Sequence, residues 1–175
     1  MKKIIILSIL SLSIFAMMWC SSGKIVEKWN TVTVDYVGKL KDGTIFDTSI
    51  ESVAKESGKY QTGRDYTQGL SFTVGAGQMI AGFDKGVEWM KVGETKTVEI
   101  PAKDAYGERS ESRLLTVPKT QIPQADQYQV GMQVMSQNGQ TFKVYKVEKD
   151  TIIFDANHEL AGKTLIFDIT VKSVK

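Results

Sequence analysis

The sequence contains very little cysteine and histidine. Among its 175 residues, Cys20 is the single cysteine and His158 the single histidine. A lone cysteine excludes a disulfide within the chain, so the fold must be stable through packing alone. Protein sites for transition metals collect several cysteine, histidine or carboxylate ligands, which makes such a site improbable here. We therefore expect no metal and no other cofactor.

An excess of charge of one sign is also lacking. The chain has 22 lysine and arginine residues and 20 aspartate and glutamate residues. Without Lys2 and Lys3, which precede an apolar leader, the two totals are equal. No stripe of basic residues is present, so we expect no nucleic-acid partner. The sequence has no internal repeat, and its apolar content of 42% is ordinary for a soluble globular protein with a real core.

The N-terminus has the pattern of an export signal. Lys2 and Lys3 precede an apolar run over residues 4–19, the order of charge and hydrophobicity typical of such signals. Cys20 follows, with small residues after it. Residues 1–20 therefore resemble a lipoprotein signal in which Cys20 becomes lipidated after cleavage.

Trp19 departs from that pattern, because a small residue normally precedes the lipidated cysteine. Two alternatives stay open: an uncleaved membrane anchor with its lysines inside, and ordinary cleaved secretion. With either a lipid or an anchor, residues 21–30 would form a linker. The folded part would then be tethered to the membrane and face the periplasm or the cell exterior.

A hairpin is expected directly after this linker. Residues 31–40 alternate apolar and polar side chains, the period-two pattern of a half-buried strand. The Asp42-Gly43 pair predicts a tight turn, and residues 45–47 continue as the returning strand. A short helix over residues 49–56 and a polar surface excursion over residues 59–69 come next.

Residues 70–90 combine a strand, a glycine turn and an amphipathic helix. Gly75 and Gly77 supply the turn, because glycine adopts backbone conformations that other residues resist. Apolar residues then recur at three- and four-residue spacing, which predicts a helix with one buried face: Ile80, Phe83, Val87 and Met90. Such a stripe is most often only core, so a functional interpretation depends on the rest of the chain.

The second half of the chain is rich in short strands. A strand over residues 94–100 ends at Pro101, and a bend over residues 103–107 projects Tyr106. A polar junction then leads to further strand candidates at residues 114–117, 133–135, 141–147 and 151–154. Alternation returns in the last strand, which includes residues 165–171. This order predicts an α+β fold, an antiparallel sheet packed on one short helix with a small, mostly β domain inserted late.

Three segments in this order resemble the FKBP family of peptidyl-prolyl cis-trans isomerases. They read VDYVGKLKDGTIFDTS, VGAGQMIAGFDKGVEWMKVGETKTVEIPAKDAYG and TLIFDITVKSV. The long segment after Tyr106, ending in DANHELAG, is similar to the SlyD-type branch, whose insert-in-flap domain is associated with chaperone activity. The resemblance implies an isomerase domain over residues 31–107 and 162–175, and an insert over residues 108–161.

The resemblance also implies a proline-binding pocket and assigns residues to it. Tyr36, Asp47, Tyr106 and Phe167 would be the catalytic positions. The substrate would be bound by Phe46, Met79, Ile80, Phe83 and, from the end of the insert, Leu160. The Tyr106 hydroxyl and the Ile80 backbone amide would donate to substrate carbonyls, while Asp47 would orient the site as a polar wall. Without the resemblance, the strand aromatics would be read as core, and His158 as a hydrogen-bonded hinge residue.

Two functions follow from the sequence. In the first, the protein is a membrane-tethered prolyl isomerase that acts on exported polypeptides, and its insert binds unfolded chains. In the second, it is a holding chaperone whose isomerase pocket is incidental, because the small insert is expected to expose apolar surface. Both imply proline-containing or unfolded polypeptides as partners, and we expect a monomer.

Overall fold

The computed structural model describes residues 23–136 and 138–175, which form a five-stranded and a four-stranded antiparallel sheet. The longer elements are β1 (Thr31–Leu40), β2 (Ile45–Thr48), α1 (Glu51–Glu56), β3 (Leu70–Thr73), α2 (Ala81–Val87), β4 (Thr95–Ile100), β5 (Leu114–Pro118), β6 (Gln133–Met135), β7 (Thr141–Val147), β8 (Thr151–Asp155) and β9 (Leu165–Val174). Short 3-10 helices lie between them, η1 (Ala102–Asp104), η2 (Glu111–Arg113), η3 (Lys119–Gln121) and η4 (Ala125–Gln127). The α+β class predicted from the sequence is confirmed.

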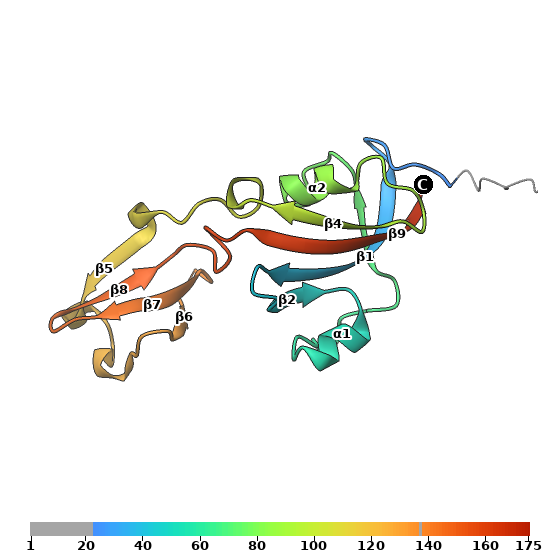
Figure 1. Ribbon diagram of the computed structural model, residues 1–175. Coiled ribbons are helices and arrows are strands. Elements are labelled where there is room, and N and C mark those ends of the chain that lie inside the picture. The colour runs from blue at the N-terminus through green and yellow to red at the C-terminus, as the bar shows by residue number, and fades with distance from the viewer. Residues whose placement is uncertain (1–22, 137) are drawn as a thin grey trace, which may run out of the picture.

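Strand β1 organises the larger sheet. The strand order of this sheet is β2-β1-β9-β4 (Figure 1). Strand β3 pairs with the first half of β1, and β2 pairs with the second half. The predicted alternation is real, since Val32, Val34 and Tyr36 are all buried and the residues between them are only partly covered. The pairing places Gly38 opposite Phe167 of β9. One face of β1 therefore supplies the core and, further along, one wall of the candidate site.

Helix α2 packs against β4 through two glycines. A Cβ atom on Gly82 would lie 2.2 Å from the Cγ2 atom of Ile100, and one on Gly86 would lie 3.0 Å from the Cγ1 atom of Val98. The helix therefore approaches the sheet more closely than any larger residue would permit. Phe83 and Val87 project from it into the main core.

The same helix is shorter than the sequence pattern predicts. It ends at Val87, because Glu88 is extended and Trp89 adopts a left-handed conformation with φ of 67°. The amide of Trp89 donates to the carbonyl of Val26 at 2.8 Å instead of continuing the helix. Met90 is still buried, so its predicted place in the core is correct although it lies outside the helix.

Residues 24–30 are part of the folded domain, which corrects the prediction that residues 21–30 form a linker. Val26 is completely buried, its amide donates to Met90 at 2.8 Å, and Ile25 forms a bridge with Lys91. The polar character of this segment concealed the one apolar residue that fills the core. The predicted signal, anchor and lipidation at residues 1–20 and Cys20 lie outside the described residues. Among the residues that are described, no helix is long and apolar enough to cross a membrane.

The smaller sheet has the strand order β5-β8-β7-β6 and its own core, centred on Val144, Ile152 and Phe154. It lies at the end of the molecule remote from the N-terminal segment (Figure 1). The two connections to the larger sheet are held together where they meet. Gly162 donates to Gly107 at 2.9 Å, and the other bonds join Ser110 to Asn157 and Arg109 to Asp155. All four strands fall within residues 108–161, the predicted insert.

The close approach of α2 to β4 gives a testable prediction. Alanine at Gly82 would gain about 0.5–1 kcal/mol of helix propensity but lose roughly 1–3 kcal/mol to overpacking against Ile100. We expect Gly82→Ala to lower the free energy of unfolding in urea. Gly86→Ala is the matched control, since its wider contact with Val98 makes the change smaller. A Gly82→Ala variant as stable as the wild type would contradict this account of the packing.

Candidate active site

A cavity with a volume of about 370 Å³ opens between the strands β1, β2 and β9 of the larger sheet and the start of α2. Its lining residues are Tyr36, Phe46, Asp47, Leu70, Gln78, Met79, Ile80, Phe83, Tyr106 and Phe167. Eight of these are residues that the family resemblance assigned to a proline pocket. Leu70 and Gln78 were not assigned, and they extend the wall formed by Met79.

Aromatic rings form the floor and inner wall of the cavity. Phe83 lies at the centre, with its ring centroid 5.0 Å from that of Phe167 and 5.9 Å from that of Tyr36. Phe46 meets Phe167 edge to face at 5.5 Å. These are favourable geometries for aromatic pairs, so the rings hold one another in place without a ligand. The floor is therefore apolar and preformed.

Gly38 permits this arrangement. A Cβ atom at this position would lie 2.8 Å from ring atoms of both Phe167 and Phe46. The two rings therefore cross over bare backbone in the middle of β1. A glycine inside an alternating strand is a known sign of close approach, and this signal was available in the sequence.

A polar cluster forms the opposite wall. The Tyr36 hydroxyl donates to Oδ2 of Asp47 at 2.5 Å, and Nη1 of Arg64 donates to Oδ1 at 2.7 Å. Arg64 also donates from Nη2 to the Tyr36 hydroxyl at 2.9 Å. Burial, followed by the hydrogen bond and charge of Asp47, raises the pKa of Tyr36 well above its usual range. The hydroxyl therefore stays protonated and remains a donor.

Arg64 changes the interpretation of Asp47. Burial by itself disfavours the charged guanidinium, yet the hydrogen bonds to Asp47 and Tyr36 raise the pKa of Arg64. The Asp47 carboxylate faces a permanent cation and accepts a further bond from the amide of Thr48. Both oxygens of the Asp47 carboxylate are therefore occupied by hydrogen-bond donors. Arg64 lies in the segment 59–69, whose polar sequence predicts a surface excursion and gives no sign of this contact.

Tyr106 covers the outer edge of the cavity. Its ring is 42% exposed and stacks on that of His158, with centroids 3.8 Å apart and planes within 4° of parallel. Burial and the charges of Asp47 and Glu159 raise the pKa of Tyr106, which keeps its hydroxyl protonated. His158 accepts a hydrogen bond at Nδ1 from the amide of Leu160. This bond agrees with the structural role predicted for His158, and the stacking adds a contact that the sequence did not indicate.

Leu160 is the predicted site residue that the structure does not bring to the cavity. Its amide bonds to His158, and Ala161 donates to the carbonyl of His158 at 2.9 Å, which makes a tight turn. Within this turn Leu160 is buried and belongs to the main core. It is not among the residues that line the cavity, and its predicted contact with substrate stays a prediction.

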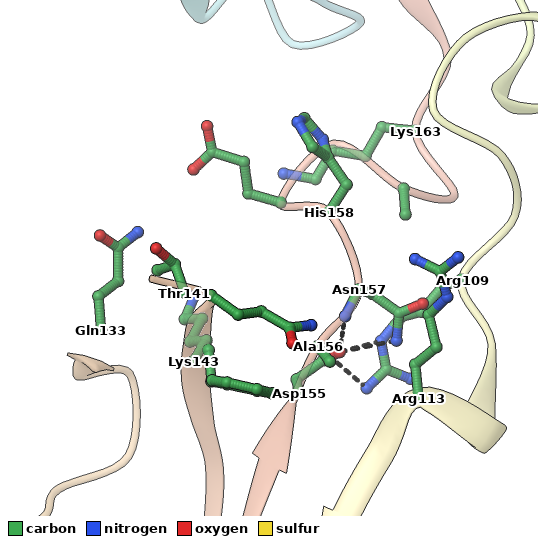
Figure 2. Close-up of a pocket in the computed structure, with 14 residues that line it drawn as sticks. Arg109, Arg113, Gln133, Thr141, Lys143, Asp155, Ala156, Asn157, His158 and Lys163 are labelled. Atoms are coloured by element: carbon green, nitrogen blue, oxygen red, sulfur yellow. Dashed lines mark hydrogen bonds and ion pairs between the residues drawn. The ribbon is translucent and has the colours of Figure 1, made fainter. Parts of the chain in front are cut away.

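A second and larger cleft, about 760 Å³ in volume, lies where the insert joins the larger sheet (Figure 2). It is lined by residues of β7, the end of β8 and the connection over residues 156–163. In Figure 2, Asp155 is joined by dashed lines to its hydrogen-bond partners on both connections between the sheets. His158 lines this cleft, while its stacking partner Tyr106 lines the aromatic cavity. The stacked pair therefore separates the two cavities.

The residues of the described ranges do not form a metal site, since no three His, Cys, Asp or Glu side chains gather there in a suitable arrangement. What the geometry offers is an apolar, aromatic cavity with hydroxyl and amide donors at its edge. A sheet wrapped on one helix, with such a cavity between them, is typical of an isomerase that binds proline rings.

Comparison with known proteins agrees with this class. Residues 23–172 match the family described as FKBP-type peptidyl-prolyl cis-trans isomerase. The short-type peptidyl-prolyl cis-trans isomerase of Methanocaldococcus jannaschii is 43% identical over 152 residues, which cover 86% of this chain and 95% of that protein. The FKBP-type isomerase SlyD of Treponema pallidum is 35% identical over 82% of this chain and 75% of its own length. SlyD of Escherichia coli is 29% identical over 86% and 70% respectively. The chain belongs to the FKBP-type peptidyl-prolyl cis-trans isomerase family.

The contact of Arg64 with two partners can be tested by Arg64→Lys. Lysine keeps the charge beside Asp47 but lacks the planar, two-armed donor that also reaches Tyr36. We expect the free energy of unfolding to fall by about 1 kcal/mol, the size of one hydrogen bond. Urea denaturation measures the loss. In a Tyr36→Phe background, Arg64→Lys should lower the free energy of unfolding by less, because Nη2 of Arg64 has already lost its acceptor, the Tyr36 hydroxyl. An equal loss in both backgrounds would show that Arg64 and Tyr36 do not interact in this way.

Proposed function

We propose that the aromatic cavity binds the proline ring of exported polypeptides and accelerates rotation about the preceding peptide bond. Peptidyl-prolyl isomerisation is the activity of the family to which the chain belongs. The observation that carries the assignment to this cavity is its composition, since five aromatic rings enclose an apolar space beside the exposed Tyr106 hydroxyl. Such a space fits the five-membered ring of proline.

The reaction needs no nucleophile. Rotation about an X-Pro bond must break amide resonance, and the barrier is about 18–20 kcal/mol. The planar amide is more charge-separated than the twisted one, so a dry, apolar cavity destabilises the planar form relative to the transition state. Each tenfold acceleration requires about 1.4 kcal/mol of preferential binding to the twisted form. A few ring contacts and one or two hydrogen bonds are enough.

The residues divide into three roles under this proposal. Phe83, Phe46 and Phe167 hold the proline ring, with Met79 and Ile80 beside them. The Tyr106 hydroxyl and the Ile80 backbone amide donate to substrate carbonyls. Asp47 and Tyr36 form a polar wall, and because both are already bonded to Arg64, they orient the site instead of transferring a proton.

The role of Tyr106 can be tested with a short proline peptide in a protease-coupled assay. Tyr106→Ala should lower kcat/KM about tenfold, equivalent to about 1.4 kcal/mol of lost transition-state binding. Tyr106→Phe keeps the ring and removes the hydrogen bond, so it should lose less. Tyr145→Phe changes an exposed tyrosine of the insert and is the matched control. Wild-type rates in all three variants would rule out Tyr106 as a substrate contact.

The second candidate function, binding of unfolded chains by the insert, has its own supporting observation. Among the described strands, β6 pairs only with β7, so its other edge is open to an added strand. Apolar side chains around this edge are exposed: Val130, Met132 and Met135, the last by 73%. Exposed apolar side chains beside an open strand edge suit capture of an extended, apolar polypeptide.

Two serine substitutions at this edge separate the functions. The Val130→Ser and Met135→Ser double variant should suppress the aggregation of an unfolded test protein less well than wild type. Its turnover of a short proline peptide should be unchanged, because the aromatic cavity is intact. Leu115→Ser is the control, since Leu115 is also an exposed apolar residue but lies on β5 at the other edge of the sheet. If the double variant suppresses aggregation fully, this edge does not bind unfolded chains.

The location of the protein is part of the proposal. An apolar run over residues 4–19 after two lysines supports export, and Cys20 supports a lipid tether. A monomeric isomerase held at the outer surface of the membrane would meet polypeptides as they emerge. Mass spectrometry of the N-terminus of the membrane-extracted protein distinguishes a lipidated Cys20 from an intact anchor and from a cleaved, soluble chain.

A further inference from the structure

Two tryptophans stand out at the end of the molecule where the described chain begins. Trp29 is 65% exposed and Trp89 is 70% exposed, and no other described tryptophan is present. Both adopt left-handed backbone conformations, with φ of 71° and 67°. Such φ values are strained for bulky residues and persist only where surrounding structure imposes them. The fold therefore uses strained backbone to present two large apolar side chains to solvent.

Backbone hydrogen bonds place the segment that precedes Trp29 beside the segment that carries Trp89. The amide of Trp89 donates to Val26 at 2.8 Å, three residues before Trp29. The amide of Trp29 donates to Val74 at 2.9 Å, which fixes the turn that carries it. Ile25 and Val92, on the two paired segments, are also 41% and 40% exposed. We call this group of four exposed apolar residues on and beside the paired segments, Ile25, Trp29, Trp89 and Val92, the tryptophan face.

The start of the described chain leads into this face. A Cβ atom on Gly23 would lie 3.5 Å from the carbonyl oxygen of Val92 and 3.8 Å from Cβ of Lys91. Gly23 follows the leader with its apolar run and Cys20. A tether attached at Cys20 would therefore join the membrane only a few residues from the tryptophan face.

We propose that the tryptophan face rests in the interfacial zone of the lipid bilayer and fixes the orientation of the domain on the membrane. Tryptophan is enriched at membrane interfaces, because its ring is apolar while its N–H can meet the polar headgroups. Ile25 and Val92 add aliphatic area that a bilayer would cover. The inference rests on the proposed tether, which brings the face to the membrane.

The net charge around the tryptophan face predicts whether it prefers anionic lipids. The segments 24–30 and 88–94 contain three lysines and three glutamates. With no net charge, the face has no electrostatic preference for anionic headgroups. Its binding is apolar, so it should occur on zwitterionic lipid and resist high salt.

This orientation suits the proposed function. The N-terminal segment and the insert lie at opposite ends of the molecule (Figure 1). A domain that rests on the tryptophan face would hold the insert at the end of the molecule far from the bilayer, where passing polypeptides can reach it (Figure 1). A tether alone would leave the domain free to turn its insert against the membrane.

The experiment uses the full chain, reconstituted into phosphatidylcholine vesicles with and without lipids brominated near the headgroup. Bromine quenches tryptophan fluorescence on contact, and flotation of the vesicles reports the tether separately. The W19F/W29F variant leaves Trp89 as the single reporter, and W19F/W89F leaves Trp29. We expect both reporters to lose fluorescence in brominated vesicles, equally at low and high salt and without anionic lipid.

Two reference positions distinguish docking from mere closeness to the tether. In the chain lacking all three native tryptophans, Tyr145→Trp reports from the insert and Lys175→Trp from the C-terminus, which pairs with Thr31 at the tethered end. Docking predicts little quenching at either. If the chain floats with the vesicles but Trp29 and Trp89 are quenched no more than a tryptophan at position 175, the docking proposal is wrong and the proposed tether is supported. The tryptophan face would then be a candidate binding surface for another protein. A chain that does not float overturns both.

Discussion

The close crossing of Phe167 and Phe46 over Gly38 is the contact on which the candidate site depends. It requires the β1–β9 register that sets Gly38 opposite Phe167. A one-residue slip would turn Phe167 to the other face of the sheet, and the aromatic floor would be lost. The register itself is held by the buried alternation of β1 and by the pairing of the same strand with β2 and β3. The sheet register, the main core and the aromatic cavity therefore depend on one another.

The polar wall of the cavity is also held together by contacts between different elements of the fold. Asp47 is next to the aromatic floor, where an uncompensated carboxylate would be costly. Arg64 reaches it from the segment between α1 and β3, and Tyr36 joins the two from β1. Among the described residues, no buried side-chain nitrogen or oxygen lacks a hydrogen-bond partner. The site can therefore be rigid and polar on one side while it remains dry on the other.

Much of this could be predicted from the sequence, for identifiable reasons. The strands and the buried residues of α2 follow from periodicity, and the pocket residues from a family pattern that fixes their positions. Arg64 could not be predicted, because its partner lies across a polar segment with no periodic signal. The end of α2 at Val87 and the burial of Val26 depend on each other through a long-range pairing, so neither is visible locally. Leu160 matched the family pattern, but it is not among the residues that line the cavity.

The hydrogen bond between Gly162 and Gly107 has a consequence for the history of the chain. The two ends of the insert leave the larger sheet within one bond of each other, 2.9 Å between nitrogen and oxygen. A turn of a few residues could close that gap at little entropic expense, since loop closure depends only weakly on length. A lineage could thus have gained the second sheet, or could shed it, as a single genetic event, without disturbing strand register or the aromatic floor. Modularity of this kind would let selection change the insert without changing the aromatic cavity.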